Sequence, residues 1–323
     1  MKAIRIEANG GPEAMRLVDV ETPAPGSGEV RVRHHAVGVN FIDTYHRSGL
    51  YKVALPSGLG LEAAGTVEAI GEDVTRFALG DRIGYCSGPT GAYAEAHVVP
   101  QTRAVRLPGA IAFDVAAASM LKGMTARYLL RKTFPVQHGH VVVIHAAAGG
   151  VGQIAVQWAA HLGATVIAVV GDDAKAQIAD ARGAHHVIVS KQENIAARVR
   201  EITNGVGADV VYDSVGKDTW DASLDSLRPR GMMVSFGNSS GPPPLFNPLT
   251  LAQKGSLFLT RPTLFAYTAA TEELDETAAD LFAVLESGAV KIAAPTRYAL
   301  ADVAQAHADL EARRTTGSIV LTP

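Results

Sequence analysis

The feature that most limits the fold is a series of short apolar segments, rich in β-branched residues, that alternate with helical patterns in the middle of the chain. Buried strands separated by helices are joined by right-handed crossovers and form a parallel sheet. We therefore predict a doubly wound α/β domain over residues 125–260. Its strands are expected at VVVIH (141–145), TVIAVV (165–170), HVIV (186–189), DVVYDSVG (209–216), MMVSFG (232–237) and SLFLT (256–260).

The segments on both sides of this domain have a different pattern. Residues 1–120 hold short alternating runs broken by Gly- and Pro-rich turns, which indicates β structure. The tail has helical patterns at 270–287 and 301–313 and ends in another strand-like run, GSIVLTP. We expect residues 1–124 and 261–323 to form one discontinuous, β-rich domain into which the α/β domain is inserted.

Composition excludes several classes of function. The 323 residues carry a net charge of −3 with no long run of one sign, so neither nucleic acid nor a membrane surface is indicated as a partner. The N-terminus lacks an apolar signal segment, and no apolar stretch reaches the roughly 18 residues needed to span a bilayer, so we expect a cytoplasmic protein. The one cysteine, Cys86, excludes an intramolecular disulfide and a multi-thiolate metal site, and is expected to pack as a small hydrophobe.

A glycine-rich loop follows the first apolar strand and opens a helical pattern. The run HAAAGGVG places Ala147, Gly149 and Gly152 at the spacing of a dinucleotide fingerprint, with alanine in the first position. Small residues there allow the backbone to approach a pyrophosphate, whose charge is met by the amides and dipole of the helix. The alternative is a tight turn without a ligand, which does not require so many small residues. We expect this loop to bind a dinucleotide.

The end of the second strand indicates which dinucleotide binds. An NAD site usually has Asp or Glu there to hold the ribose hydroxyls. In VVGDDAK, Gly171 leaves space for a 2′-phosphate and Lys175 can neutralise it, which favours NADPH. Asp172 and Asp173 could instead accept a ribose hydroxyl, although capping the following helix is the simpler role for both.

The segment GVNFIDTYHRSGLY is unusually polar and aromatic for a connection in a core-building domain. Loops on a rigid scaffold often carry binding residues. Alternatively, Arg47 pairs with Asp43 or Glu62 and only maintains the shape of the loop. The candidate site residues in this segment are Asn40, Asp43, Tyr45 and Tyr51.

Together these motifs resemble the NADPH:quinone oxidoreductases, the zeta-crystallin-like, zinc-free branch of the medium-chain dehydrogenase/reductase superfamily. The similarity covers nearly the whole chain, including GVNFIDTYHRSGLY, LPSGLGLEAAGTVEAIG, LKGMTARYLLRKT, HAAAGGVG, VVYDSVGKDTW, VSFGNSSG and TGSIVLTP. It implies a GroES-like β-rich domain beside a Rossmann domain, NADPH as the cofactor and a small-molecule quinone as the substrate. It also implies a homodimer, in which SLFLT, if it is an edge strand, pairs with its symmetry mate.

The zinc-dependent members of the superfamily hold a catalytic metal through Cys and His. In GLGLEAAG, Leu61 stands where that histidine would be, and no cysteine lies near Asn40. Zinc sites of this kind need thiolate or imidazole ligands. We therefore expect no metal.

The resemblance also implies roles for individual residues. The catalytic candidates are Tyr51, Asn40, Asp43 and Tyr45. The cofactor-binding candidates are Phe41, Thr125, Tyr128, Gly150, Val151, Gly171, Lys175, Ser190, Gly237, Asn238, Ser239, Ser240 and Arg313. Relatives often have a tyrosine at position 190, so Ser190 removes an adenosine contact that Lys191 could replace.

Three functions follow from these observations. The favoured function is metal-free reduction of a quinone by NADPH, in which the developing oxyanion needs hydrogen-bond donors rather than a Lewis acid. The second is reduction of an alkenal or enone by NADPH. The third is nucleotide binding with little turnover. The available donors are Tyr51, Tyr45, Asn40 and Asn238, and water could supply the proton.

Overall fold

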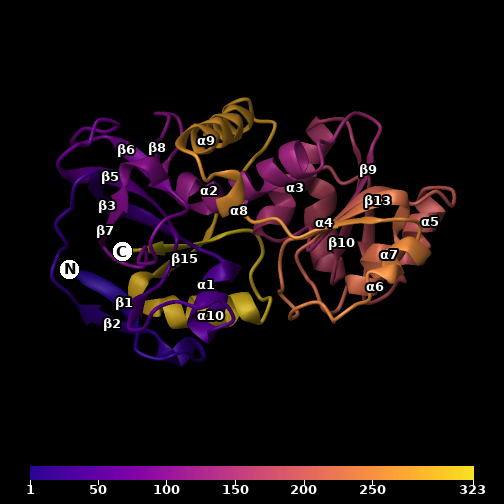
Figure 1. The fold of residues 1–323 in the computed structure, drawn as a ribbon, viewed down its shortest axis with the longest axis horizontal. Coiled ribbons are helices and arrows are strands. Elements are labelled where there is room, and N and C mark those ends of the chain that lie inside the picture. Colours follow the sequence, from indigo (N-terminus) through magenta and orange to yellow (C-terminus); the bar gives the residue numbers. More distant parts are fainter. The chain divides into compact units, whose positions relative to one another are not determined.

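The computed structural model describes all 323 residues, and the chain divides into two compact units (Figure 1). Unit 1 comprises Met1–Met124, Thr268–Glu286 and Ile292–Pro323, and unit 2 comprises Thr125–Tyr267 and Ser287–Lys291. The chain therefore leaves unit 2 after Tyr267, later than the boundary at residue 260 expected from the sequence. The predicted combination of a β-rich unit and a parallel α/β unit is confirmed.

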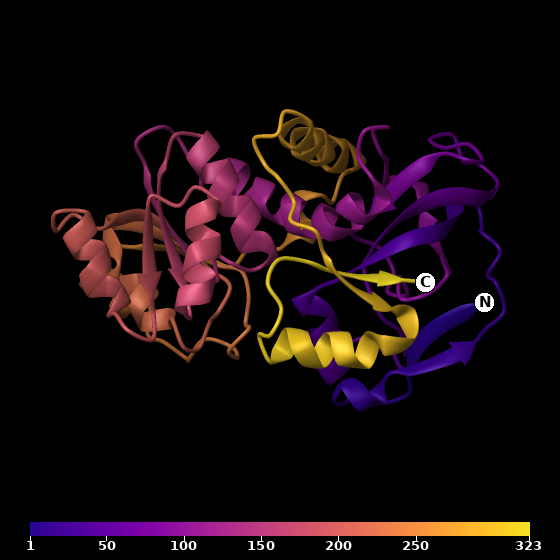
Figure 2. The same ribbon diagram turned by 180° about the vertical axis from the view of Figure 1, so that it is seen from behind.

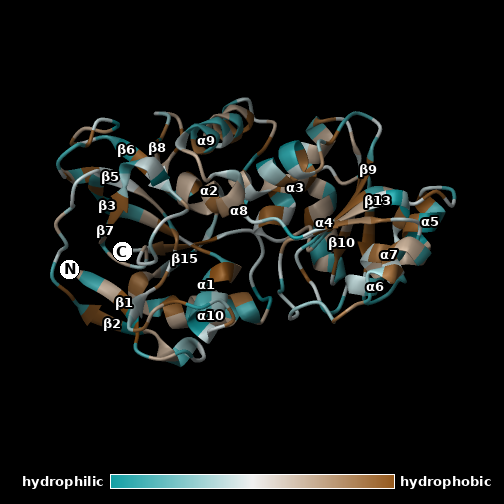
Figure 3. Ribbon diagram, viewed as in Figure 1, coloured by the Kyte–Doolittle hydropathy of each residue, from teal (hydrophilic) through white to brown (hydrophobic).

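Unit 2 is built on a six-stranded sheet in which every pairing is parallel, in the order β11-β10-β9-β12-β13-β14. The apolar strand residues form its core and give the sheet its brown colour in Figure 3. Chain order reverses between β9 and β12, and ligands bind at such switch points of α/β sheets. The strands are β9 (Val141–His145), β10 (Thr165–Val170), β11 (His186–Val189), β12 (Ala208–Asp213), β13 (Leu227–Ser235) and β14 (Phe258–Thr260).

Helices separate the strands of unit 2, as the alternating pattern predicts. The first of them, α3, buries Ile154, Ala155, Trp158 and Ala159, and Gly163 follows it with a φ of 83°. The helices are α3 (Gly150–His161), α4 (Asp173–Ala181), α5 (Ile195–Ile202), α6 (Trp220–Asp225), α7 (Leu249–Gln253) and α8 (Leu264–Tyr267). Helix α2 (Phe113–Tyr128) passes from one unit to the other and continues into a π-helical turn, Leu129–Thr133.

Unit 1 contains a seven-stranded sheet with the path β15-β16-β3-β5-β6-β8 and a three-stranded sheet, β2-β1-β4. The long strand β3 pairs with β5 on one side, while β7 and β16 share the other side. The strands are β1 (Lys2–Ile6), β2 (Arg16–Asp19), β3 (Glu29–Val39), β4 (Ser57–Gly58), β5 (Glu62–Ile70), β6 (Arg82–Tyr85), β7 (Ala96–Pro100), β8 (Ala104–Arg106), β15 (Thr296–Ala299) and β16 (Ile319–Thr322). The C-terminal strand thus completes a sheet begun by the N-terminal segment.

Helices cover the unit 1 sheets. They are α1 (Phe41–Ser48), α9 (Thr271–Glu286) and α10 (Val303–Glu311), with 3₁₀ turns η1 (Pro12–Ala14), η2 (Gln101–Arg103) and η4 (Leu300–Asp302). Helix α10, yellow in Figure 2, packs against both η1 and α1. None of the helices in the structure combines the length and apolar character that a membrane span requires.

The segment interpreted as a loop from its polar composition is helix α1, so that expectation was wrong. Its ends carry strong local signals: Asn40 is the N-cap, and its backbone N–H donates to Oδ2 of Asp43 at 2.8 Å. Gly49 ends the helix in the left-handed region, with φ at 82°. A capping box and a C-terminal glycine define a helix even when most of its side chains are polar.

Candidate active site

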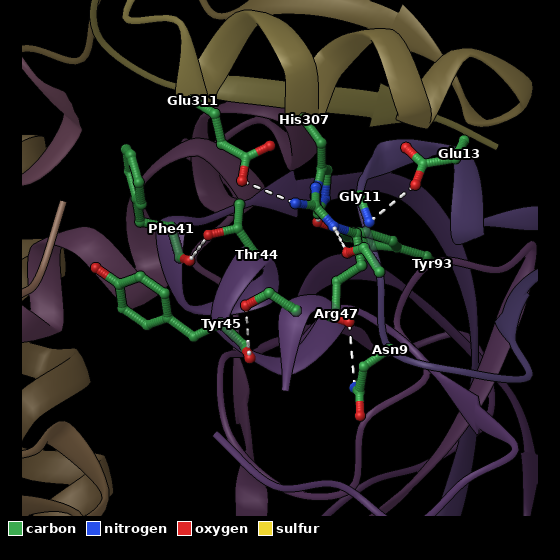
Figure 4. A network of polar contacts seen from close by, with 12 residues as sticks. Asn9, Gly11, Glu13, Phe41, Thr44, Tyr45, Arg47, Tyr93, His307 and Glu311 are labelled. Atoms are coloured by element: carbon green, nitrogen blue, oxygen red, sulfur yellow. Dashed lines mark hydrogen bonds and ion pairs between the residues drawn. The ribbon is translucent and has the colours of Figure 1, made fainter. Parts of the chain in front are cut away.

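A chain of hydrogen bonds connects helix α10 with the start of α1 (Figure 4). Arg47 donates through Nη2 to Glu311 at 2.7 Å and through Nη1 to Nδ1 of His307 at 3.0 Å. His307 Nε2 lies 2.9 Å from the hydroxyl oxygen of Tyr93, which donates to Oδ2 of Asp43 at 2.7 Å. Because Arg47 can only donate, Nδ1 of His307 is an acceptor and Nε2 carries the proton. Every donor between Arg47 and Asp43 therefore points towards the carboxyl group of Asp43.

Burial shifts the pKa values along this chain. It raises the pKa of Asp43 to about 7, although Tyr93 and the backbone of Asn40 donate to the carboxyl group. Burial, together with the neighbouring charge of Arg47, lowers the pKa of His307 to about 3. A neutral imidazole is required if Nδ1 is to accept from Arg47.

The suggested pairing of Arg47 with Asp43 or Glu62 is wrong. The guanidinium forms a salt bridge with Glu311, and its Nε donates to the carbonyl oxygen of Gly10 at 3.1 Å. The physical reason is the position of Arg47 in the last turn of α1, which directs its side chain towards α10.

A second buried cluster surrounds Glu62, whose exposed fraction is 0%. Its carboxylate accepts from Nδ2 of Asn40 at 2.8 Å and from the backbone N–H of Leu121 at 2.7 Å. The ammonium of Lys122 lies 3.3 Å away, and its side chain is only 8% exposed. A Cβ at Gly38 would overlap the carboxylate, which explains the glycine in β3. The cluster fixes the side chain of Asn40.

The donor set at this place does not fit a catalytic zinc. No group of three or more His, Cys, Asp or Glu residues is arranged to hold a metal ion. Leu61 and Cys86 are both buried, and the sulfur of Cys86 lies 3.4 Å from that of Met124. The carboxylate of Glu62 is already bound to Lys122 and two other donors. Zinc sites of dehydrogenases use thiolate and imidazole ligands together, and no such set of ligands is assembled here.

Aromatic side chains gather at α1. The ring centroids of Tyr45 and Tyr51 are 5.1 Å apart with an edge-to-face arrangement, and the backbone N–H of Tyr51 donates to the carbonyl oxygen of Tyr45. The ring centroids of Phe41 and Tyr45 are 6.1 Å apart, and both side chains leave α1 on the side away from Arg47 (Figure 4). The structure thus brings Phe41, Tyr45 and Tyr51 together, while Asn40 and Asp43 are held inside unit 1.

In unit 2, the glycine loop joins β9 to α3. A Cβ at Gly152 would collide with the carbonyl oxygen of Ala146, so only glycine allows the helix to approach the turn this closely. Gly149 is the N-cap, and no side chain caps the first turn of α3. The first amides of the helix, those of Gly150 and Val151, can therefore be offered to a ligand. This arrangement fits the pyrophosphate of a dinucleotide.

The residues at the end of β10 leave space for a further group. A Cβ at Gly171 would meet no heavy atom within 4 Å. Asp172 caps α4 by accepting from the backbone N–H of Lys175 at 3.0 Å, as predicted, and its carboxylate also lies 3.2 Å from the Lys175 ammonium. Ser190 is held close to the end of β10, since its hydroxyl donates to the carbonyl oxygen of Val170 at 3.1 Å. Open space beside a half-buried lysine fits a phosphate.

The other predicted cofactor residues occupy several positions. Gly237, Asn238, Ser239 and Ser240 follow β13 as one turn. Thr125 is buried in α2, and the ring of Tyr128 stacks on that of Tyr267 at 4.8 Å. Arg313 is exposed after α10 and belongs to unit 1.

Tyr93, His307 and Lys122 were not among the residues predicted from the sequence. Tyr93 and His307 are 214 residues apart, so no local spacing connects them. The one signal for Lys122 is an isolated charge in the apolar run AAASMLKGMTA.

Comparison with known proteins decides the family. Residues 26–109 match the alcohol dehydrogenase GroES-like domain, and residues 150–283 match the family described as zinc-binding dehydrogenase. A quinone oxidoreductase of Pseudomonas aeruginosa is 53% identical over 100% of this chain and 99% of its own. The chain belongs to the quinone oxidoreductase family. The resemblance stated from the sequence motifs is thereby confirmed.

Two further proteins are similar over all or nearly all of their length. The crystal structure of Escherichia coli quinone oxidoreductase complexed with NADPH matches with a TM-score of 0.98 at 48% identity, covering 100% of both chains. A 2-haloacrylate reductase from a Burkholderia species is 44% identical over 98% of each chain.

Proposed function

We propose that this chain is an NADPH-dependent quinone reductase. The observation that carries the proposal is full-length similarity to quinone oxidoreductases, including one complexed with NADPH, in a chain whose own glycine loop fits a dinucleotide. Most of the cofactor contacts are assigned to unit 2, and unit 1 is assigned the donors for the quinone.

The cofactor assignment follows the geometry of unit 2. The amides of Gly150 and Val151 hold the pyrophosphate, and the space at Gly171 receives the 2′-phosphate with Lys175 as its cation. Ser190 lies beside this group. The remaining candidates, Phe41, Thr125, Tyr128, Gly237, Asn238, Ser239, Ser240 and Arg313, are assigned to the nicotinamide, the ribose or a second phosphate contact.

NADPH supplies the hydride of the reaction. A quinone that gains a hydride becomes a hydroquinone anion, which takes up one proton to give the hydroquinone. The chain contributes hydrogen-bond donors to the developing oxyanion. Of the candidate donors we favour Tyr45 on α1, with water as the proton source. Tyr51, which follows the helix and is in ring contact with Tyr45, is assigned to stacking on the quinone. The side chain of Asn40 is bound to Glu62 and that of Asp43 to Tyr93 and the backbone of Asn40, so we assign both residues to positioning the helix rather than to direct contact.

The reaction is proposed to proceed without metal. Glu62 is neutralised by Lys122, and Leu61 occupies the position next to it, so no metal is needed to balance the buried carboxylate. Activity should survive exhaustive chelation. Stoichiometric zinc in the active protein, measured by elemental analysis, would contradict this.

A substrate panel tests the proposed function. Oxidation of NADPH is followed at fixed enzyme concentration with 1,4-benzoquinone, with an enone and with a 2-haloacrylate, and each is repeated with NADH. Rapid turnover with the quinone and NADPH is expected. Preference for the enone or haloacrylate would favour the second function, which the similarity to a 2-haloacrylate reductase keeps open. Tight binding of NADPH with no turnover of any substrate would favour the third function.

The same chain is proposed to form a homodimer through β14. This strand is the edge of the six-stranded sheet, and Phe258 on it is 58% exposed. An edge strand offers unpaired backbone groups to another chain. Pairing with its symmetry mate would satisfy these groups and give a continuous sheet of twelve strands.

A further inference from the structure

A buried polar cluster lies at the carboxyl end of β12 in unit 2. Asp213, the last residue of this strand, is 0% exposed and accepts four hydrogen bonds. Oδ1 accepts from the backbone N–H groups of Val215 and Gly216 at 2.7 and 3.0 Å. Oδ2 accepts from the hydroxyls of Thr219 and Ser223 at 2.7 and 2.6 Å. Burial alone raises the pKa of Asp213, but the His145 imidazole and these donors outweigh it and keep the pKa below its ordinary value.

The cluster also includes His145, which ends β9 directly before the glycine loop. Its Nε2 lies 3.0 Å from the hydroxyl oxygen of Ser223. Since Ser223 donates to Asp213, the imidazole must donate to Ser223. In a hydrolytic triad the imidazole lies between serine and aspartate, whereas here the hydroxyl lies between them. All three side chains are buried, so the cluster is positional and not nucleophilic.

The carboxylate of Asp213 sets the path of residues 214–218. With the amides of Val215 and Gly216 turned towards Asp213, the carbonyl oxygen of Val215 faces the other way. It accepts from both the backbone N–H and the hydroxyl of Ser240, at 2.9 and 2.8 Å. The carbonyl oxygen of Ser214 accepts from the N–H of Ser239 at 3.2 Å.

Close backbone packing makes this connection stiff. A Cβ at Gly216, whose φ is 91°, would lie 2.5 Å from the carbonyl oxygen of Gly241. A Cβ at Gly237 would lie 2.5 Å from the carbonyl oxygen of Ser214. The two loops are therefore in backbone contact with no side chain between them. A displacement of residues 214–218 must move the Gly237–Ser240 turn as well.

We propose that Asp213 is a positioning residue for the nicotinamide end of NADPH, acting through residues 214–218 on the turn at Gly237–Ser240. This rests on the proposed function, which assigns that turn to the cofactor. Asp213 does not touch the ligand. It holds residues 214–218 and, through them, the Gly237–Ser240 turn that contacts the ligand. Through Ser223 and His145 it also connects this backbone to β9, the strand that carries the glycine loop.

The chain offers a matched control on the same strand. Asp209 lies near the amino end of β12, where it accepts from Arg228 at 2.6 Å and from the backbone N–H of Val141 at 2.7 Å. Asp209→Asn and Asp213→Asn therefore remove equivalent charges from the two ends of one strand. Only Asp213→Asn is expected to weaken NADPH binding, by about tenfold, because small misplacements of a binding backbone have effects of this size or larger.

The experiment measures NADPH affinity by cofactor fluorescence and hydrogen exchange of the Ser239 and Ser240 amides without cofactor. In Asp213→Asn both amides should lose protection, the affinity for NADPH should fall and the KM for quinone should stay unchanged. In Asp209→Asn affinity and protection should equal those of the wild type. If Asp213→Asn does not fold, Thr219→Val and Ser223→Ala each remove one donor and should change both readouts in the same direction.

The outcomes separate this inference from the proposed function. A wild-type protein that does not bind NADPH would reject the proposed function. Suppose instead that the wild type binds NADPH. Unchanged affinity and amide protection in Asp213→Asn, or in both hydroxyl variants, would then overturn the positioning role. Equal losses in Asp209→Asn would also overturn it, because the effect would then follow from general destabilisation of β12.

Discussion

At the scale of single residues, the side chains in and next to α1 have two kinds of surroundings. Tyr51 and Phe41 are half-buried and lie in ring contact with or near Tyr45. Asp43, in contrast, is enclosed by Tyr93 and the backbone of Asn40. Residues that are close in sequence therefore have different surroundings, and we assign them different roles.

Tyr51 is expected to act by stacking on the flat quinone. Tyr51→Phe keeps the ring and should have kinetics close to those of the wild type. Tyr51→Ala should raise the KM for quinone about fivefold, since an aromatic contact is worth about 1 kcal/mol. Steady-state kinetics of both variants decide the role. A loss of kcat in Tyr51→Phe with little change in KM would instead identify the hydroxyl as a donor in the transition state.

Lys175 is expected to contact the 2′-phosphate. Lys175→Ala should raise the KM for NADPH about tenfold, because a hydrogen bond to a charged group contributes about 1.5–3 kcal/mol. The KM for NADH should not change. Lys2→Ala, which removes a lysine paired with Asp19 in unit 1, is the control and should affect neither cofactor. Equal effects of Lys175→Ala on both cofactors would contradict the assignment.

Asp43 predicts a pH dependence of stability. Its pKa is raised from 3.8 to about 7 by burial, so the folded state holds the proton more tightly than the unfolded chain. This contribution to stability is complete below about pH 4 and is lost as pH rises through about 7. Each pKa unit corresponds to about 1.4 kcal/mol, which sets an upper bound of about 4 kcal/mol.

Asp43→Asn mimics the protonated group and is the test of this prediction. As the pH rises from 5 to 8, the melting temperature of the wild type should fall relative to that of the variant. Asp19→Asn, at an exposed site, should show no such trend over this range. A constant difference for Asp43→Asn would mean that Asp43 does not titrate in this range.

At the scale of elements, the connection between α1 and α10 depends on one cation. Arg47 is 3% exposed and its counter-ion Glu311 is 37% exposed. Removing Glu311 leaves a buried cation without its partner, which costs about 3–5 kcal/mol. Removing Arg47 leaves a carboxylate that water can reach, so its cost should be smaller, about 1–3 kcal/mol.

Denaturant midpoints should therefore fall more in Glu311→Ala than in Arg47→Met. Arg297→Met, which breaks the more exposed pair between Arg297 and Asp114, is the control and should cost no more than about 1 kcal/mol. The opposite order of Glu311→Ala and Arg47→Met would show that hydrogen bonds from Arg47 to His307 and Gly10 dominate over the ion pair.

At the scale of the whole molecule, the exposed edge of the unit 2 sheet predicts assembly. A charge at Phe258 would lie in the proposed strand pairing and would be desolvated there. Phe258→Asp should therefore sediment as a monomer at micromolar concentration while the wild type sediments as a dimer. Leu79→Asp is a matched control, since Leu79 is 63% exposed and lies in unit 1. A monomeric wild type would reject the dimer.

The sequence by itself determined the architecture of unit 2 and the chemistry of its loop. Alternating β-branched strands and helices leave few topologies, and all six predicted strands pair in parallel. The glycine loop, Gly171 and the Asp172 cap are local features, since each depends on residues within a few positions of one another. Local signals also defined α1, although the polar composition of the segment led to its interpretation as a loop.

Only the tertiary structure decided which charged and polar groups meet. The path from Glu311 to Asp43 joins side chains up to 264 residues apart, and Glu62 meets Lys122 across 60 residues. Asp213 contacts its four donors locally, but its effect on Ser239 and Ser240 depends on two strands lying side by side. Such contacts arise when the chain closes on itself, and burial then sets their pKa values. No spacing of residues in the sequence encodes these contacts or these pKa values.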